Sequence, residues 1–208
     1  MSKLTTAIAT LGVVAGLGVA ALPLSSYAEG SAEATQKLKA TIDESISIEA
    51  TGSDAEGNPS TDNVVDLGLV TLGGNPVTGA GTLKVMTNNP SGYTVSVKVE
   101  GADTNMNNVT TGGSGTIANG TPTKGTSAWG LKGGTGREYQ APFKGAYGAV
   151  TNADQAYYKT TAGSAADGDV IDTNYGVSAS ADQEAGVYEV ELTFTAAVNN
   201  SVNPTPNA

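Results

Sequence analysis

The residue types that carry out most enzyme chemistry are missing from this chain. It has 208 residues and contains neither His nor Cys. Catalysis by a Cys nucleophile or a His acid–base pair is therefore excluded, and so are zinc sites built from these residues. Paired carboxylates could still serve a glycosidase. The acidic residues cluster in turns, however, and no pair stands out, so we expect a protein that is not an enzyme.

One acidic stretch has the composition of a calcium site. Asp167, Asp169 and Asp172 place oxygen ligands close together in the sequence, and calcium takes about six to eight oxygens. The spacing does not match an EF-hand loop. A solvated acidic turn has the same composition, and a second acidic loop at 54–62 leaves the same two alternatives. Calcium is the single cofactor candidate, and no other cofactor is expected.

Aromatic residues form a second group of candidates. Trp129 is the one tryptophan of the chain, and Tyr157 and Tyr158 are adjacent. Exposed rings of this kind stack on sugars or pack against partner proteins, so the three residues are candidate ligand or interface positions. A lone tryptophan in a chain with two phenylalanines is also typical of a core residue.

Alternation of apolar and polar residues predicts the strands that position these side chains. It is clearest at 93–100, where Tyr93 and the valines that follow occupy every second position. The turn formers at 87–92 predict that this strand pairs in a hairpin with the strand before it. The same alternation predicts further strands at 38–50, as one long bent strand or as two, and at 64–72, 170–179 and 188–196.

A local spacing before the last strand indicates how the sheets are linked. An acidic residue at Glu184, a glycine at Gly186 and a tyrosine at Tyr188 have the spacing of a tyrosine corner. In that motif the tyrosine hydroxyl bonds back to the main chain and fixes the crossing between sheets. A simple turn before an outward-facing tyrosine is the alternative.

Together these patterns predict an all-β fold, an antiparallel β-sandwich with Ig-like or Greek-key connections and about seven to nine short strands. We expect a single domain at 37–198, in which 101–168 is a loop-heavy insertion rich in Gly, Thr and Tyr. Residues 29–36 read as a flexible segment and 199–208 as a polar tail. A compositional bias like that of 101–168 is also seen in partly disordered chains.

The first 28 residues have the features of a secretory signal peptide. Lys3 is followed by an apolar run, 4–22, and Ser26-Tyr27-Ala28 presents small residues at a cleavage site. An uncleaved N-terminal anchor is the alternative, because the run is almost long enough to span a bilayer. No later run has that length, so no mature transmembrane helix is expected. The formal charge of −10 repels phosphates and argues against nucleic acid as a partner.

Several segments resemble a known family of secreted proteins. The segment Asp66-Leu67-Gly68, the strand-and-turn stretch 83–97 and the closing stretch 185–196 resemble relatives of the WxL cell-surface domain of bacteria with Gram-positive-type envelopes. That resemblance implies a β-sandwich associated non-covalently with peptidoglycan. The two signature tryptophans are replaced, by Tyr93 in the early motif and by Leu192 in the late one, and Trp129-Gly130-Leu131 lies at neither position.

The function expected from the residues and the resemblance is that of a non-catalytic structural or adhesive protein, secreted and held at the cell surface. It would bind through loops on the sandwich, with a cell-wall polymer, a glycan or a surface protein as partner. One alternative is a homopolymer, a pilus or surface-layer subunit assembled by strand addition, with 38–50 as the donated strand. A second is a carbohydrate-active enzyme that works through carboxylates.

Overall fold

The computed structural model describes residues 42, 44–60 and 62–200, all of which belong to one compact unit, 40–208. The predicted signal peptide, the predicted flexible segment at 29–36 and most of the predicted polar tail lie outside these residues. In the part that the structure describes, no helix is long and apolar enough to cross a bilayer.

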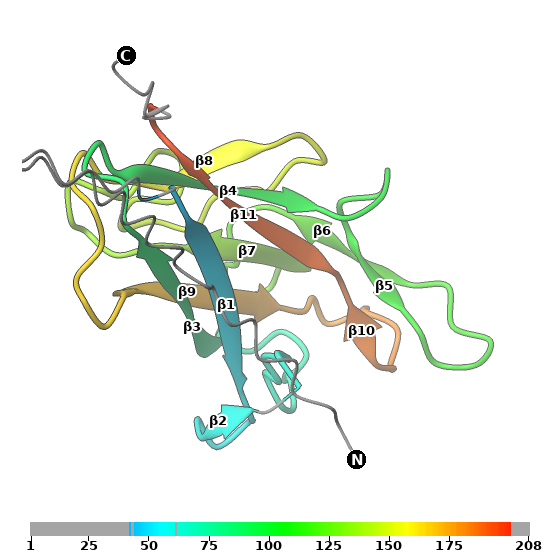
Figure 1. The fold of residues 1–208 in the computed structure, drawn as a ribbon. Helices are drawn as coiled ribbons and strands as arrows, with labels where there is room; N and C mark the ends of the chain where they lie inside the picture. The colour runs from blue at the N-terminus through cyan, green and yellow to red at the C-terminus, as the bar shows by residue number, and fades with distance from the viewer. Residues whose placement is uncertain (1–41, 43, 61, 201–208) are drawn as a thin grey trace, which may run out of the picture. The chain divides into compact units, whose positions relative to one another are not determined.

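The described residues form two β-sheets (Figure 1). The larger has the order β10-β5-β6-β7-β9-β3-β1-β2 and the smaller the order β11-β4-β8. All strand pairs are antiparallel except β6 with β7. The strands are β1 (Ile46–Ser53), β2 (Pro59–Ser60), β3 (Val77–Thr87), β4 (Tyr93–Val99), β5 (Met106–Asn108), β6 (Thr116–Asn119), β7 (Ala128–Lys132), β8 (Gln155–Lys159), β9 (Asp169–Ser178), β10 (Tyr188–Glu189) and β11 (Leu192–Val198).

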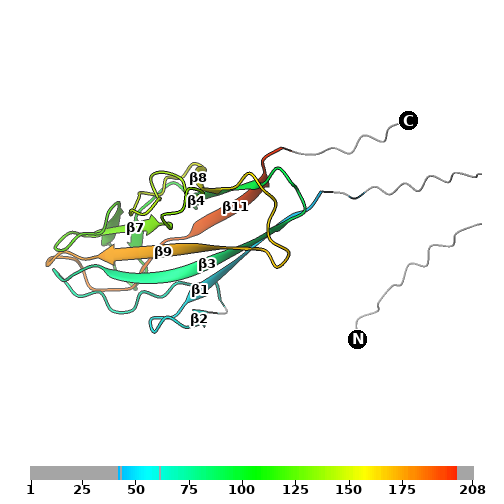
Figure 2. The same cartoon turned by 90° about the vertical axis from the view of Figure 1, so that its left-hand side faces the viewer.

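The two sheets face each other as the layers of a sandwich. Figure 2 shows β4, β8 and β11 lying over β9, β3 and β1. The predicted all-β sandwich is confirmed. Its core is built from the alternating apolar positions of both layers, because successive side chains of a strand point to opposite faces. The fully buried side chains of the core include Leu83, Val85, Tyr93, Val95, Val97, Leu131, Phe143, Val150, Tyr157 and Ile171.

The predicted hairpin between β3 and β4 is wrong. The two strands alternate as expected, but β3 pairs with β1 and β9 in the larger sheet, whereas β4 pairs with β11 and β8 in the smaller one. The turn at 88–92 therefore carries the chain from one layer to the other. Gly92 makes this possible, because its φ is +79° and a Cβ there would lie 2.3 Å from the carbonyl oxygen of Thr160.

The predicted strand at 188–196 is divided between the two layers. Residues 188–189 form β10 beside β5, and residues 192–198 form β11 beside β4. The crossing is fixed as the tyrosine-corner spacing predicted: the Tyr188 hydroxyl donates to the main-chain carbonyl of Glu184 at 2.7 Å. Gln183 Nε2 donates to the same hydroxyl at 2.7 Å.

The predicted strand at 64–72 is also wrong. This stretch is extended but forms no ladder beyond an isolated bridge between Leu72 and Ala179. Gly68 adopts a φ of +65° and breaks the alternation, so Leu69 is 91% exposed instead of sharing the buried face of Leu67. Val65 and Leu67 of this stretch instead pack over Gly79 and Gly81 of β3. These glycines have no side chain to fill the space on that face of the strand.

The long strand predicted at 38–50 is described from Ile46 onward. As expected, Ile46 and Ile48 pack against the core. All residues from Ile46 to Thr51 pair with β3, so this half of the predicted donor strand already belongs to its own sheet. Residues 38–41 lie outside the described part of the chain.

The Gly-, Thr- and Tyr-rich region 101–168 supplies β5, β6 and β7 to the larger sheet and β8 to the smaller one. The strands are short and separated by loops, as the sequence predicted. Two of the loop residues, Phe143 and Val150, are fully buried, so the loops contribute to the core.

Candidate binding groove

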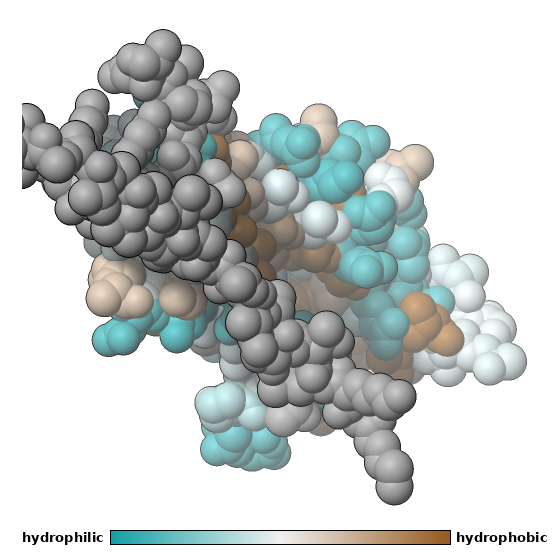
Figure 3. All heavy atoms as spheres, in the orientation of Figure 1, coloured by the Kyte–Doolittle hydropathy of each residue, from teal (hydrophilic) through white to brown (hydrophobic). Residues whose placement is uncertain are grey.

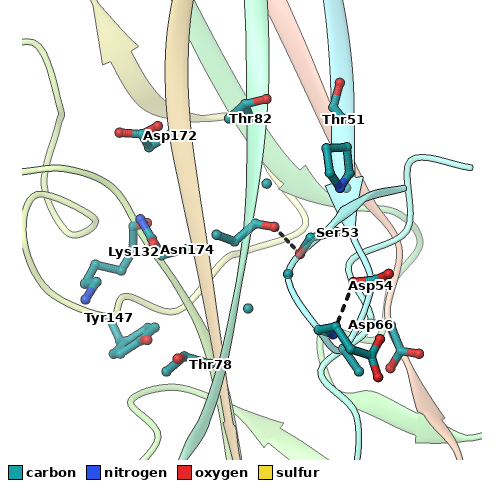
Figure 4. A pocket seen from close by; sticks show the side chains of 18 residues that line it. Thr51, Ser53, Asp54, Asp66, Thr78, Thr82, Lys132, Tyr147, Asp172 and Asn174 are labelled. Atoms are coloured by element: carbon teal, nitrogen blue, oxygen red, sulfur yellow. Dashed lines mark hydrogen bonds between the residues drawn. The ribbon is translucent and has the colours of Figure 1, made fainter. Parts of the chain in front are cut away.

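A polar groove of about 630 Å³ crosses the outer face of the larger sheet. Its lining comes from the ends of β1 and β3, from β9 and β7, and from the loops at 54–57 and 147. Figure 4 shows Lys132, Tyr147, Asp172 and Asn174 on one side of β3, and Ser53, Asp54 and Asp66 on the other. The volume lies within the range of about 300–1,000 Å³ typical of small-ligand sites.

The floor of the groove follows from strand alternation and from small side chains. On β3, Leu83 points into the core, so Thr78, Ala80 and Thr82 point outward. On β9, Asp172 and Asn174 point outward beside them, because Asp172 pairs with Thr82 and Asn174 with Ala80. Ala80 lies in the middle of this row, and a small residue there leaves the sheet face open between its polar neighbours.

One wall is built by Tyr147 and Lys132. The ring of Tyr147 packs on the backbone of Gly176, where an added Cβ would lie 2.8 Å from the ring. The Lys132 ammonium lies 4.9 Å from the centre of the same ring, a cation–π distance. Burial raises the pKa of the Tyr147 phenol, so this hydroxyl is a protonated donor at neutral pH.

The opposite wall is a loop that Asp54 organises. The Asp54 carboxylate accepts hydrogen bonds from the backbone amides of Glu56 and Asn58, at 3.1 and 2.7 Å, and from the Asn58 side chain at 3.0 Å. These bonds hold the pKa of Asp54 below its usual value, and the bond from the Asn58 side chain contributes most. Ser53 anchors the start of the loop by donating to the carbonyl of Ala80 at 2.5 Å.

The backbone of Asp172 is fixed from the sandwich interior. The hydroxyl of Tyr157, on β8, donates to the Asp172 carbonyl at 2.7 Å. The Tyr139 hydroxyl accepts from the Asp172 amide at 3.0 Å. The aspartate side chain itself is exposed on the outer face. The carboxylate is thus presented to the groove from a backbone that both layers hold in place.

The groove offers hydroxyls, carboxylates, an amide, an ammonium and one aromatic ring. Groups of this mixture donate to and accept from several ligand hydroxyls, while a ring edge or face packs against a sugar's C–H surface. Its acidic side chains, Asp54, Asp66 and Asp172, repel phosphorylated ligands. The arrangement therefore suits a polyhydroxylated ligand without phosphate.

The predicted calcium ligands are not brought together. Asp169 and Asp172 lie on opposite faces of β9, because they are three positions apart along a strand and side chains alternate between its faces. The Asp169 carboxylate is bound by the Tyr93 hydroxyl at 2.7 Å and the Ala165 amide at 3.0 Å. Asp167 lies in the preceding turn. Among the described residues no cluster of three or more acidic side chains could hold a metal ion.

None of the three predicted aromatic ligand residues lines the groove. Trp129 is 2% exposed and donates from Nε1 to the Thr104 carbonyl at 3.1 Å. Tyr157 is fully buried. These two are core side chains, the alternative that the sequence left open for Trp129. Tyr158 is half-buried, and its ring stacks on Tyr93 with the ring centres 6.1 Å apart.

Sequence reasoning missed the groove because no segment contains it. Its residues come from six separate stretches, and the pairing of β1, β3, β9 and β7 places most of them side by side. One signal was available: alternation at 170–177 puts Asp172 and Asn174 on the polar face of a strand. A scan against models of known protein families found no match, and a search of curated proteins found no related protein.

Proposed function

We propose that the protein is a non-catalytic protein of the cell surface that binds a glycan in the groove on the outer face of its larger sheet. The observation that carries the proposal is the groove's lining, in which Thr82, Asp172, Asn174, Lys132 and Tyr147 converge on a shallow polar hollow. Further support comes from the secretion signal read in the sequence and from the acidic charge of the chain.

A binding role is favoured over a carboxylate-dependent enzyme by the state of Asp54, one of the acids that line the groove. Such an enzyme needs one carboxyl group that stays protonated near neutral pH, which requires a raised pKa. Asp54 has the opposite shift, because it accepts three hydrogen bonds within its own loop. The absence of His and Cys from the whole chain leaves few other groups for proton transfer.

Binding of the protein to purified peptidoglycan and to neutral oligosaccharides immobilised on a surface tests the proposal. Asp172→Asn and Lys132→Gln should each weaken binding at least tenfold, since each removes a charged hydrogen-bonding group from the groove. Asp172→Asn leaves the bonds of Tyr139 and Tyr157 intact, because these involve the Asp172 main chain.

Matched controls for these two variants lie on exposed loops outside the groove. Asp154→Asn and Lys144→Gln make the same chemical changes at exposed positions and should bind like the unaltered protein. Failure of the unaltered protein to bind any glycan would contradict the proposal. Release of shorter glycans that Asp172→Asn abolishes would contradict its non-catalytic part.

A further inference from the structure

A second hollow opens between the two sheets and shares Thr51, Gly52 and Thr82 with the rim of the groove. It has a volume of about 730 Å³ and lies between the last residues of β1 and the first residues of β11. Apolar side chains line its base, among them Leu83, Trp129, Tyr175, Leu192 and Phe194. Figure 3 shows hydrophobic residues gathered in the hollow beside β11. Leu192 and Phe194 remain only half-buried there.

The strand beside this cleft has an open edge, in the sense that no strand is hydrogen-bonded to it there, although β1 lies close to part of that edge. β11 is the terminal strand of the smaller sheet and pairs with β4 alone among the described strands. At the ends of that pair the Glu100 amide donates to the Glu191 carbonyl and the Asn199 amide to the Gly92 carbonyl. In an antiparallel pair every second residue bonds to the partner strand, and the residues between point their backbone groups away from it. Since Glu191 and Asn199 bond to the partner, the odd-numbered residues of β11 bond to β4. The amides and carbonyls of Phe194 and Ala196 therefore point toward the open edge.

The chain contains a segment whose sequence has the pattern of a strand that would fit the open edge of β11. Residues 29–42 follow the predicted cleavage site, and the alternation of Leu38, Ala40 and Ile42 predicts one apolar face for this segment. At about 3.3 Å per residue it would reach roughly 40 Å, more than the length of β11. Lys37 and Lys39 flank Leu38, whereas Glu189 and Glu191 lie at the mouth of the cleft, so the charges are complementary.

The path of the chain before β1 leads away from its own cleft. Ser45 donates from its amide to Asn88 Oδ1 at 2.8 Å and accepts from Thr87 Oγ1 at 2.8 Å. Glu44 accepts a bond from the Asn89 side chain. These bonds continue the line of β1 past Ile46, toward the end of the sandwich opposite the cleft. Ile42 is 81% exposed, so its own copy leaves this apolar side chain uncovered.

We propose that the cleft beside β11 accepts residues 29–42 of a second copy of this chain, which add as a strand to the open edge of β11. The backbone groups of Phe194 and Ala196 would pair with the incoming strand, and its Leu38 and Ile42 would enter the apolar cleft. Because the chain enters β1 at the end opposite the acceptor cleft, the contact would be head-to-tail and would extend into a chain of copies.

Light scattering after size-exclusion chromatography of the chain from residue 29 onward tests this inference. The mass should rise with concentration beyond that of one copy. Leu38→Asp combined with Ile42→Asp should weaken the association at least tenfold, because it places charges on the donor's apolar face. Thr35→Asp combined with Thr41→Asp adds the same charge on the opposite face and should associate like the unaltered chain.

The acceptor is tested by Ala196→Pro. This change removes an amide hydrogen that points to the open edge, so the pairing of β11 with β4 keeps its bonds. Circular dichroism checks that the variant keeps its strands. At a concentration where the unaltered chain associates, Ala196→Pro alone and the Leu38/Ile42 variant alone should each be mostly monomeric. Their mixture should form dimers, because one supplies the donor and the other the cleft.

Three outcomes would overturn the inference. They are a single-copy mass at every concentration, an association that neither set of changes affects, and a mixture that stays monomeric. The donor changes lie outside β1 to β11, so they test the inference even if Ala196→Pro prevents folding.

Discussion

The Tyr93 hydroxyl donates a hydrogen bond to Asp169 Oδ2 at 2.7 Å and so ties the smaller sheet to the larger one. Tyr93 begins β4 and Asp169 begins β9, so the bond joins the layers where the chain crosses between them. Tyr93 is fully buried. A bond to a charged acceptor in such a place contributes more than an ordinary hydrogen bond.

Removing that hydroxyl should destabilise the fold. Tyr93→Phe is expected to lower the free energy of unfolding by about 1–3 kcal/mol, the cost of losing a bond to a charged group. Urea unfolding measures the difference. Tyr158→Phe is the matched control, because that ring stacks on Tyr93 but the described residues include no hydrogen-bond partner for its hydroxyl; its effect should stay within about 0.5 kcal/mol. Equal effects of the two changes would contradict the role of the Asp169 bond.

Stability should fall in alkaline solution because of two buried tyrosines. Burial and the Asp169 carboxylate raise the pKa of Tyr93, and burial raises the pKa of Tyr157. The folded protein keeps these protons at a pH where the unfolded chain loses them. Their stabilisation is therefore complete below about pH 10 and declines above it, by about 1.4 kcal/mol per pH unit for each tyrosine.

Unfolding measured between about pH 9 and pH 12 tests this expectation. The double change Tyr93→Phe and Tyr157→Phe should make the decline less steep, since phenylalanine does not titrate. A smaller decline should remain, because burial also raises the pKa values of Tyr139, Tyr147, Tyr158 and Tyr175. A decline of unchanged slope in the double variant would show that other groups cause it.

Trp129 should behave as a core residue. As the one tryptophan of the chain, it reports its own surroundings by fluorescence. In the folded protein we expect emission at shorter wavelength than in urea and little quenching by iodide, since the ring is 2% exposed. Trp129→Ala should lower the free energy of unfolding by about 3–5 kcal/mol. Strong iodide quenching of the folded protein would instead place the ring on the surface.

The turn between the layers should depend on Gly92 for two reasons. Gly92 and Gly101 both have positive φ, +79° and +90°, but only Gly92 lies against another backbone segment, at Thr160. Gly101→Ala should cost about 1 kcal/mol from backbone strain alone. Gly92→Ala adds a clash and should cost about 3 kcal/mol or more. Thermal unfolding compares the two, and equal costs would contradict the close approach to Thr160.

The strands could be predicted from the sequence better than their partners could. Alternation identified the buried face of β4 correctly, because it depends only on neighbours along the chain. It could not show that β3 and β4 lie in different layers, since a tight turn permits either pairing or crossing. The same limit applies to 188–196, where the chain changes sheets at Val190 and Glu191 without losing its alternation.

The candidate site was less predictable for the same reason. Asp169 and Asp172 are close in sequence, but the pleat of β9 puts them on opposite faces. Asp172 and Lys132 are 40 positions apart, yet β7 and β9 pair and bring both to one groove. A binding surface made by sheet pairing leaves only a weak trace in any single segment.

Nuclear magnetic resonance titration of the protein with soluble peptidoglycan fragments and neutral oligosaccharides tests the central claim most directly. We predict that a binding glycan shifts the amide signals of Thr82, Lys132, Tyr147, Asp172 and Asn174, and that the glycan's own signals show no conversion to product. Shifts confined to other parts of the molecule, or no shift with any of these glycans, would contradict the account.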